Sequence, residues 1–99
     1  MNNLQKLDKV SVINSFKYHK PDLHPKLDLG NAINQEYDNN MKELVSLAKM
    51  LNGDRNTLLI HFWGDSKSGL KAIVEGENKD MIDRINGFFT EWFKKQDEF

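Results

Sequence analysis

The sequence contains no cysteine, only two prolines and no run of apolar residues long enough to cross a membrane. Without thiols, disulfide bonds, thiolate metal sites and cysteine nucleophiles are all excluded. A transmembrane helix needs about 20 predominantly apolar residues, and the first residues of the chain also lack the apolar stretch of a secretory signal. We therefore expect a soluble, cytoplasmic protein without a membrane partner.

An excess of charge of one sign is also absent, since 14 basic and 15 acidic side chains give a formal net charge of -1. Such a chain has no overall field that would attract duplex nucleic acid, and we expect no such partner. The apolar share of 38% and the charged share of 29% are ordinary for a folded domain. We predict a single domain over residues 1-99.

The N-terminal segment, residues 1-29, is predicted to be extended or rich in loops. The β-branched residues between Val10 and Ile13 favour a strand, and we expect extended structure from Val10 to Tyr18. Both prolines of the chain fall within residues 20-29, where each disfavours the helical conformation in the residue before it. This second stretch is therefore predicted to be a loop.

The remainder, residues 30-99, is predicted to form a core of helix, hairpin and helix. Apolar residues recur at steps of three and four between Asn31 and Leu51, which is the spacing of one helical face, and Asn31 is a suitable N-cap. The last helix is expected to begin with Asp80 as its cap. Its apolar stripe comprises Met81, Ile82, Ile85, Phe88, Phe89, Trp92 and Phe93.

Between the two helices, residues 57-63 are rich in β-branched and aromatic side chains and predict a strand whose two faces are both largely apolar. Residues 70-75 alternate in the same way, and the glycines and serines of residues 64-69 predict the turn of an antiparallel hairpin. The turn contains glycine, serine and lysine, as phosphate-binding loops do. A strand and not a helix follows it, so we expect a plain hairpin turn and no phosphate site there.

These elements define an α+β domain in which a long helix and a C-terminal helix pack on one face of a small antiparallel sheet. An isolated hairpin is marginally stable in water. We therefore expect either a third strand from residues 10-18 or a sheet edge contributed by a second subunit.

A first candidate site lies in the N-terminal segment, where aromatic rings alternate with cations. Such a segment can hold a phosphate or stack on a base. The alternative is a strand that leads into the proline loop, with its rings directed inward and its lysines solvated. The predicted ligand-binding residues are Phe16, Lys17, Tyr18, His19 and Lys20.

The string Phe-x-Tyr-His-x-Pro at residues 16-21, followed by a helix that ends with Leu-Val-Ser-Leu-Ala at residues 44-48, resembles the opening of a family of small phage proteins. Those proteins sequester cyclic oligonucleotide messengers and so blunt bacterial immunity. The resemblance implies that Lys17, His19 and Lys20 contact phosphate. The phage proteins are wholly helical after this opening, whereas this chain continues into the predicted hairpin.

A second candidate site is formed by His61, Trp63 and Asp65, which strand alternation places on one face. A histidine base oriented by a carboxylate is one interpretation, and ordinary packing or solvent exposure is the other. A metal ion normally needs three or four ligands, and no further ligand occurs at a matching spacing. We predict no metal site and no cofactor.

A third candidate is the aromatic stripe of the last helix, which carries more apolar surface than a two-stranded sheet can cover. The uncovered part would form an interface with a protein partner or with a second copy. The predicted interface residues are Phe88, Phe89, Trp92 and Phe93.

Three classes of function remain. The first, which we favour, is a small non-catalytic interaction or inhibitor protein that self-associates. The second is a protein that sequesters a small phosphate-bearing ligand through residues 16-20. The third, a small enzyme that uses His61, is the least supported, because no nucleophile with an adjacent base can be assembled from the sequence. We therefore predict no catalytic residues.

Overall fold

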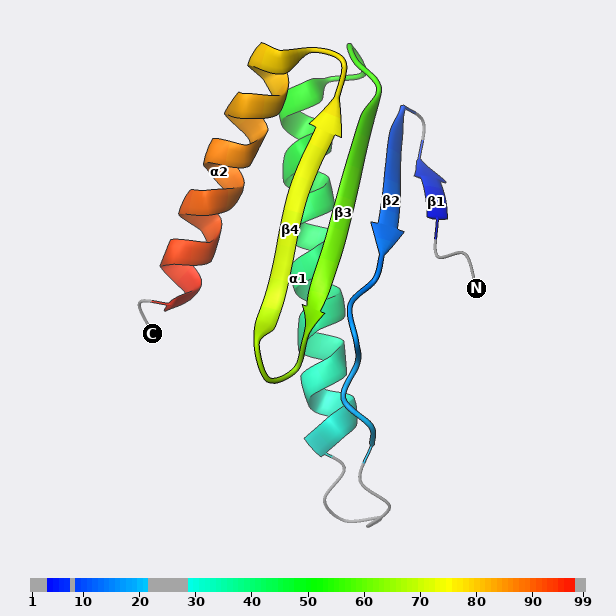
Figure 1. The fold of residues 1–99 in the computed structure, drawn as a ribbon, viewed down its shortest axis with the longest axis vertical. Helices are drawn as coiled ribbons and strands as arrows, with labels where there is room; N and C mark the ends of the chain where they lie inside the picture. Colours follow the sequence, from blue (N-terminus) through cyan, green and yellow to red (C-terminus); the bar gives the residue numbers. More distant parts are fainter. Residues whose placement is uncertain (1–3, 8, 22–28, 98–99) are drawn as a thin grey trace.

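A computed structural model describes residues 4–7, 9–21 and 29–97 of the chain (Figure 1). In chain order the elements are β1 (Leu4–Leu7), β2 (Val10–Asn14), α1 (Leu29–Asn52), β3 (Leu58–Asp65), β4 (Gly69–Gly76) and α2 (Lys79–Asp97). Most of the loop predicted for residues 20-29 lies outside the described residues. No helix in the described ranges is long and apolar enough to cross a membrane.

The four strands form one sheet in the order β1-β2-β3-β4. The hairpin of β3 and β4 is antiparallel, as predicted, and so are β1 and β2. The predicted third strand is confirmed as β2, but β2 and β3 are parallel. The expectation of an antiparallel sheet was therefore wrong. The reason is that α1 lies between β2 and β3 in the chain and returns it to the end of the sheet where β2 began, as a parallel connection requires.

Beyond the end of β2 the chain continues alongside β3. The backbone N–H of Ser15 donates to the carbonyl of Phe62 at 2.8 Å, and that of Lys17 donates to the carbonyl of Gly64 at 2.9 Å. The extended structure predicted as far as Tyr18 is thus observed as a five-residue strand followed by a looser continuation.

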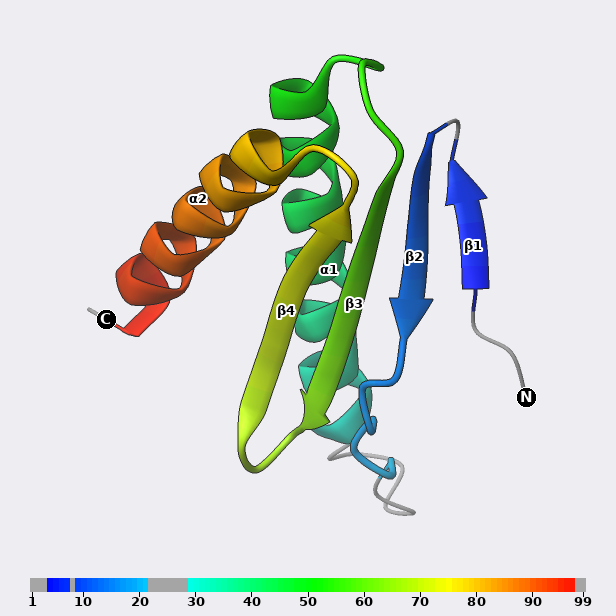
Figure 2. The same ribbon diagram turned by 45° about the horizontal axis from the view of Figure 1, so that its top comes forward.

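Both helices pack on one face of the sheet. Figure 1 shows α1 behind the strands and α2 beside β4, and Figure 2 shows the same arrangement from a tilted direction. The core lies between the sheet and the helices, and Leu44, Ile60 and Ile85 are completely buried in it. Its members are Val10, Val12, Phe16, Met41, Leu44, Ala48, Leu58, Ile60, Phe62, Val74, Met81, Ile85 and Phe89.

Two predicted helix caps were wrong. The first helix begins at Leu29, so that Asn31 lies within its first turn. This earlier start is accompanied by a tertiary contact, because Gly30 packs so closely on Pro21 that a Cβ atom there would lie 2.7 Å from the Pro21 Cα. At α2 the cap is Asn78, whose Oδ1 accepts a hydrogen bond from the N–H of Met81 at 3.0 Å. Asp80 instead lies in the first turn, where its charge suits the helix dipole.

Candidate functional site

The face of the sheet opposite the helices is its most distinctive surface. Because side chains alternate along a strand, the residues between the buried positions of β2, β3 and β4 point away from the helices. Within the described ranges no helix covers this side, as Figures 1 and 2 show. We call it the helix-free face, and it comprises Ser11, Ile13, Leu59, His61, Trp63, Lys71, Ile73 and Glu75.

The centre of the helix-free face is a row of three cross-strand neighbours. Ile13 on β2 pairs with His61 on β3, which in turn pairs with Ile73 on β4. Ile73 is 39% exposed and Trp63 is 36% exposed, so large apolar side chains remain open to water. The rings of His61 and Trp63 lie 5.4 Å apart at an angle of 46°. The sequence placed these two rings on one face, and the structure brings them into contact.

The helix-free face is also hollowed at one end. A shallow groove of about 510 Å³ lies there, where β2, β3 and β4 approach the side of the molecule that carries Thr57 and Glu77. Its residues on the face itself are Ser11, Ile13, Leu59 and Glu75.

Asp65, the third member of the predicted cluster, has a structural role in the hairpin turn. Its Oδ1 accepts hydrogen bonds from the backbone N–H groups of Lys67 at 2.9 Å and Ser68 at 2.7 Å, and from the Ser68 hydroxyl at 2.9 Å. These bonds from Ser68 and Lys67 lower the pKa of the Asp65 carboxyl. The carboxylate therefore stabilises the hairpin turn through its Oδ1 atom. Among the described residues no group of three or more metal-ligating side chains is found.

The predicted ligand-binding segment is divided between core and surface. Phe16 is 5% exposed, and its ring packs against those of Tyr18 and Tyr37 at 5.2 Å and 4.6 Å. Lys17, His19 and Lys20 are exposed. Of the alternative, a strand with its rings directed inward and its lysines solvated, the structure shows the buried ring of Phe16 and the exposed lysines, but Tyr18 is 41% exposed.

The segment is held in place by a side chain of α1. Asn34 accepts a hydrogen bond from the His19 N–H at 2.8 Å and donates one to the His19 carbonyl at 2.7 Å. The backbone at His19 is therefore anchored to the helix, while its imidazole lies at the surface.

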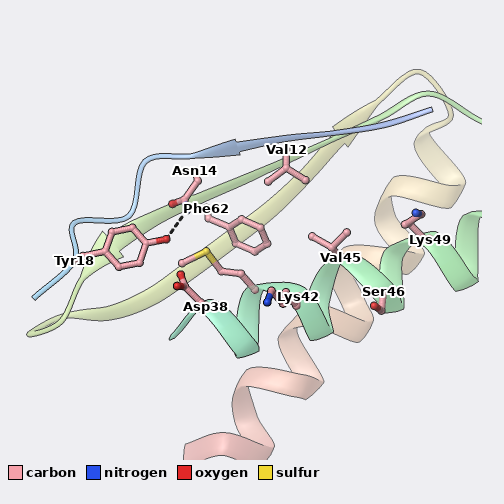
Figure 3. Close-up of a pocket in the computed structure, with 10 residues that line it drawn as sticks. Val12, Asn14, Tyr18, Asp38, Lys42, Val45, Ser46, Lys49 and Phe62 are labelled. Atoms are coloured by element: carbon pink, nitrogen blue, oxygen red, sulfur yellow. Dashed lines mark hydrogen bonds between the residues drawn. The ribbon is translucent and has the colours of Figure 1, made fainter. Parts of the chain in front are cut away.

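Tyr18 borders a groove of about 640 Å³ between β2 and α1 (Figure 3). Its hydroxyl accepts a hydrogen bond from the Asn14 side chain at 2.6 Å. Partial burial and a hydrogen bond with Asp38 raise the pKa of the Tyr18 phenol. The groove has an apolar floor and a polar rim, and it is lined by Val12, Asn14, Tyr18, Asp38, Met41, Lys42, Val45, Ser46, Lys49 and Phe62.

The sequence did not indicate the α1 residues of this Tyr18 groove. Asp38, Lys42 and Lys49 stand beside the apolar stripe of the helix, as ordinary solvated positions do. Their place in a groove depends on the parallel pairing of β2 with β3, which sets β2 next to this side of α1. No local pattern in the sequence reports that pairing.

The predicted interface residues of α2 lie in different environments. Phe89 is 2% exposed and belongs to the core, whereas Phe88 is 44% exposed. Trp92 and Phe93 are partly buried, with their rings 5.1 Å apart, and border a groove of about 530 Å³ beside β4. The stripe is covered more than was expected because α2 packs on β4 and also against α1, which buries Met81, Ile85 and Phe89.

Comparisons of the chain with models of protein families, with curated proteins and with solved structures find no match.

Proposed function

We propose that this protein is a non-catalytic interaction domain that self-associates through the helix-free face of its sheet. The observation that supports this is the apolar row of Ile13, His61 and Ile73, with Leu59 and Trp63 on either side of it. In a sheet with one face in water, the side chains on that face are normally polar. Here Ile13, Leu59 and Trp63 hold three of the five outward positions of the two central strands, and such an apolar patch is characteristic of an association surface.

The proposed surface differs from the one expected on the last helix. Phe89 is already covered within the monomer, and of the four predicted aromatic residues Phe88 is the most exposed. The helix-free face instead combines an exposed tryptophan with isoleucine and leucine in one continuous patch. Tryptophan is enriched among the residues that contribute most to binding energy at protein interfaces.

The size of the face suggests how strong the association is. Three strands at about 4.8 Å and eight residues at about 3.3 Å give a patch of roughly 14 by 26 Å. The outline of this patch is about 360 Å², less than half of the about 800 Å² that a specific interface commonly buries on each partner, so we expect a weak association. We therefore expect a dimer in exchange with its monomer at micromolar concentrations.

Sedimentation velocity over a series of protein concentrations tests this function. The wild-type protein should change from monomer to dimer, and Ile73→Lys should remain monomeric because it places a charge in the apolar row. Met50→Lys is the matched control, since Met50 is 74% exposed on α1 and lies outside the helix-free face. Circular dichroism should show both variants folded. A wild-type protein that stays monomeric throughout, or equal loss of dimer in both variants, would refute the proposal.

The Tyr18 groove supports a second candidate function, the binding of a small phosphate-bearing ligand. Lys42 and Lys49 stand two helical turns apart on its rim, and its floor is apolar enough to receive a base. Isothermal titration calorimetry with a panel of nucleotides tests this second function. Lys42→Ala should abolish the heat of binding, whereas the control variant Lys95→Ala, on α2, should preserve it. Absence of heat with the wild-type protein would exclude this candidate.

A further inference from the structure

We propose that two copies of the chain pack face to face across a two-fold axis that runs perpendicular to the strands and over the row of Ile13, His61 and Ile73. This inference rests on the proposed self-association and specifies its geometry. The proposed axis follows from where the charged side chains, the large side chain of Trp63 and the groove lie on the helix-free face.

The two ends of the helix-free face are different and complementary. Two residues from the central row in one direction, Trp63 on β3 pairs with Lys71 on β4. Two residues in the other direction, Leu59 pairs with Glu75. At about 3.3 Å per residue each pair lies about 7 Å from the row, so that a cation and an anion are equidistant from the proposed axis.

Rotation by half a turn about that axis keeps each strand opposite its own copy and exchanges the two ends of the face. Lys71 of each copy therefore lies opposite Glu75 of the other, and the symmetry generates this ion pair twice. Two packed sheets lie about 10 Å apart with their strands within about 30° of each other. Lysine and glutamate side chains are long enough to span this separation and to absorb the rotation.

The same rotation brings a projecting side chain over a hollow. Trp63 of each copy lies opposite Leu59 of the other, at the end of the face where the groove of about 510 Å³ is located. An indole ring enters such a groove readily, because its floor includes Ile13 and Leu59. Shape and charge, which are independent observations, thus select the same axis.

A two-fold axis parallel to the strands gives a poorer fit. It would exchange β2 with β4 and place Glu75 opposite Ser11, so that no ion pair forms. It would also stack Trp63 against its own copy and leave the groove unfilled. The perpendicular axis instead produces an apolar centre with charged pairs at its margin, which is the usual anatomy of a protein interface.

Charge reversal tests this geometry. Lys71→Glu makes both ends of the face acidic and Glu75→Lys makes both ends basic, so each variant alone should form a much weaker dimer. We expect its dissociation constant to rise about tenfold or more, because two attractions become two repulsions. An equimolar mixture of the two variants should regain a dimer close to wild type in strength, since every opposing pair is then attractive. The double variant K71E/E75K should also dimerise.

Sedimentation velocity measures the two single variants, their mixture, the double variant and the wild type, with circular dichroism as the check on folding. A wild-type dimer combined with a mixture that stays monomeric would overturn the proposed axis and leave self-association intact. A wild-type monomer would instead overturn the proposed function itself. If either single variant fails to fold, the salt dependence of the wild-type dimer supplies the test. Its dissociation constant should rise between about 0.05 M and about 0.5 M salt, because salt screens the ion pairs. A dissociation constant that does not change with salt would contradict the ion pairs.

Discussion

The side chain of Asn86 on α2 forms two hydrogen bonds with the backbone of Val74 on β4. Its Oδ1 accepts from the Val74 N–H at 2.9 Å, and its Nδ2 donates to the Val74 carbonyl at 3.0 Å. Because β4 is the last strand of the sheet, these backbone groups point away from β3. The amide takes the place of a neighbouring strand and blocks this part of the edge.

Replacing Asn86 with alanine should destabilise the protein. The change leaves the N–H and carbonyl of Val74 without their partners in a partly buried position, which costs about 1–3 kcal/mol. Chemical denaturation measures the loss of unfolding free energy. Asn39→Ala, at an exposed position of α1, is the matched control and should change the unfolding free energy little. Equal values for the two variants would show that the amide does not support the edge.

The junction between α1 and β3 depends on Asn52, which is 1% exposed. Its Nδ2 donates to the Asn56 carbonyl at 2.9 Å and its Oδ1 accepts from the Asn56 N–H at 3.2 Å. Asn52→Ala should lower the unfolding free energy by about 2 kcal/mol, since buried backbone groups lose their partners. Asn52→Asp should cost more, because it removes the donor and buries a charge. Equilibrium urea denaturation compares the two, and an aspartate variant as stable as wild type would contradict this role.

The two glycines at the hairpin turn should respond differently to alanine. Gly64 and Gly69 both have positive φ values, of 100° and 91°. A Cβ atom on Gly64 would overlap the carbonyl oxygen of Gly69, whereas one on Gly69 would have no neighbour within 4 Å. Gly69→Ala should therefore cost about 1–2 kcal/mol from backbone strain alone, and Gly64→Ala should cost more. Thermal unfolding monitored by circular dichroism gives the order, and the reverse order would contradict the observed turn geometry.

The stability of the hairpin turn should depend on pH through Asp65. Hydrogen bonds from Ser68 and Lys67 hold the pKa of this carboxyl below its usual value of 3.8. The ionised carboxylate therefore contributes stability at neutral pH, and this contribution is lost as the pH falls through the lowered pKa.

Thermal melts of wild type and Asp65→Asn across this range measure the effect. The asparagine keeps an acceptor oxygen but carries no charge, so wild type should have the higher melting temperature at neutral pH. The difference should narrow as the carboxylate is protonated in acid. A difference in melting temperature that stays constant with pH would show that the charge of Asp65 contributes nothing to the turn.

Local pattern was sufficient to predict most of the secondary structure. The spacing of three and four that ends in Leu51 predicted the helix observed as α1, and the alternation from Thr57 to Glu75 predicted the hairpin of β3 and β4. These predictions were confirmed because helix and hairpin depend on residues that are close in the chain. The prediction of the N-cap of α2 was wrong because two nearby residues, Asn78 and Asp80, are both good N-caps. The path of the backbone decides between them.

The candidate surfaces were only partly predictable. Alternation alone placed His61 and Trp63 on one side of a strand, and the apolar character of both sides of that strand was visible in the sequence. Neither the alternation nor the apolar character of the strand shows which face of the sheet the helices cover and which face stays exposed.

The sequence by itself thus determined the helices, the hairpin, the strand at Val10 and the apolar character of both strand faces, because all of these depend on neighbouring residues. Only the tertiary structure decided that β2 runs parallel to β3, that both helices lie on the Ile60 side, and that Ile73 stays in water. The physical reason is that strand pairing and helix packing join residues distant in the chain, and their energies depend on how the whole apolar surface is shared.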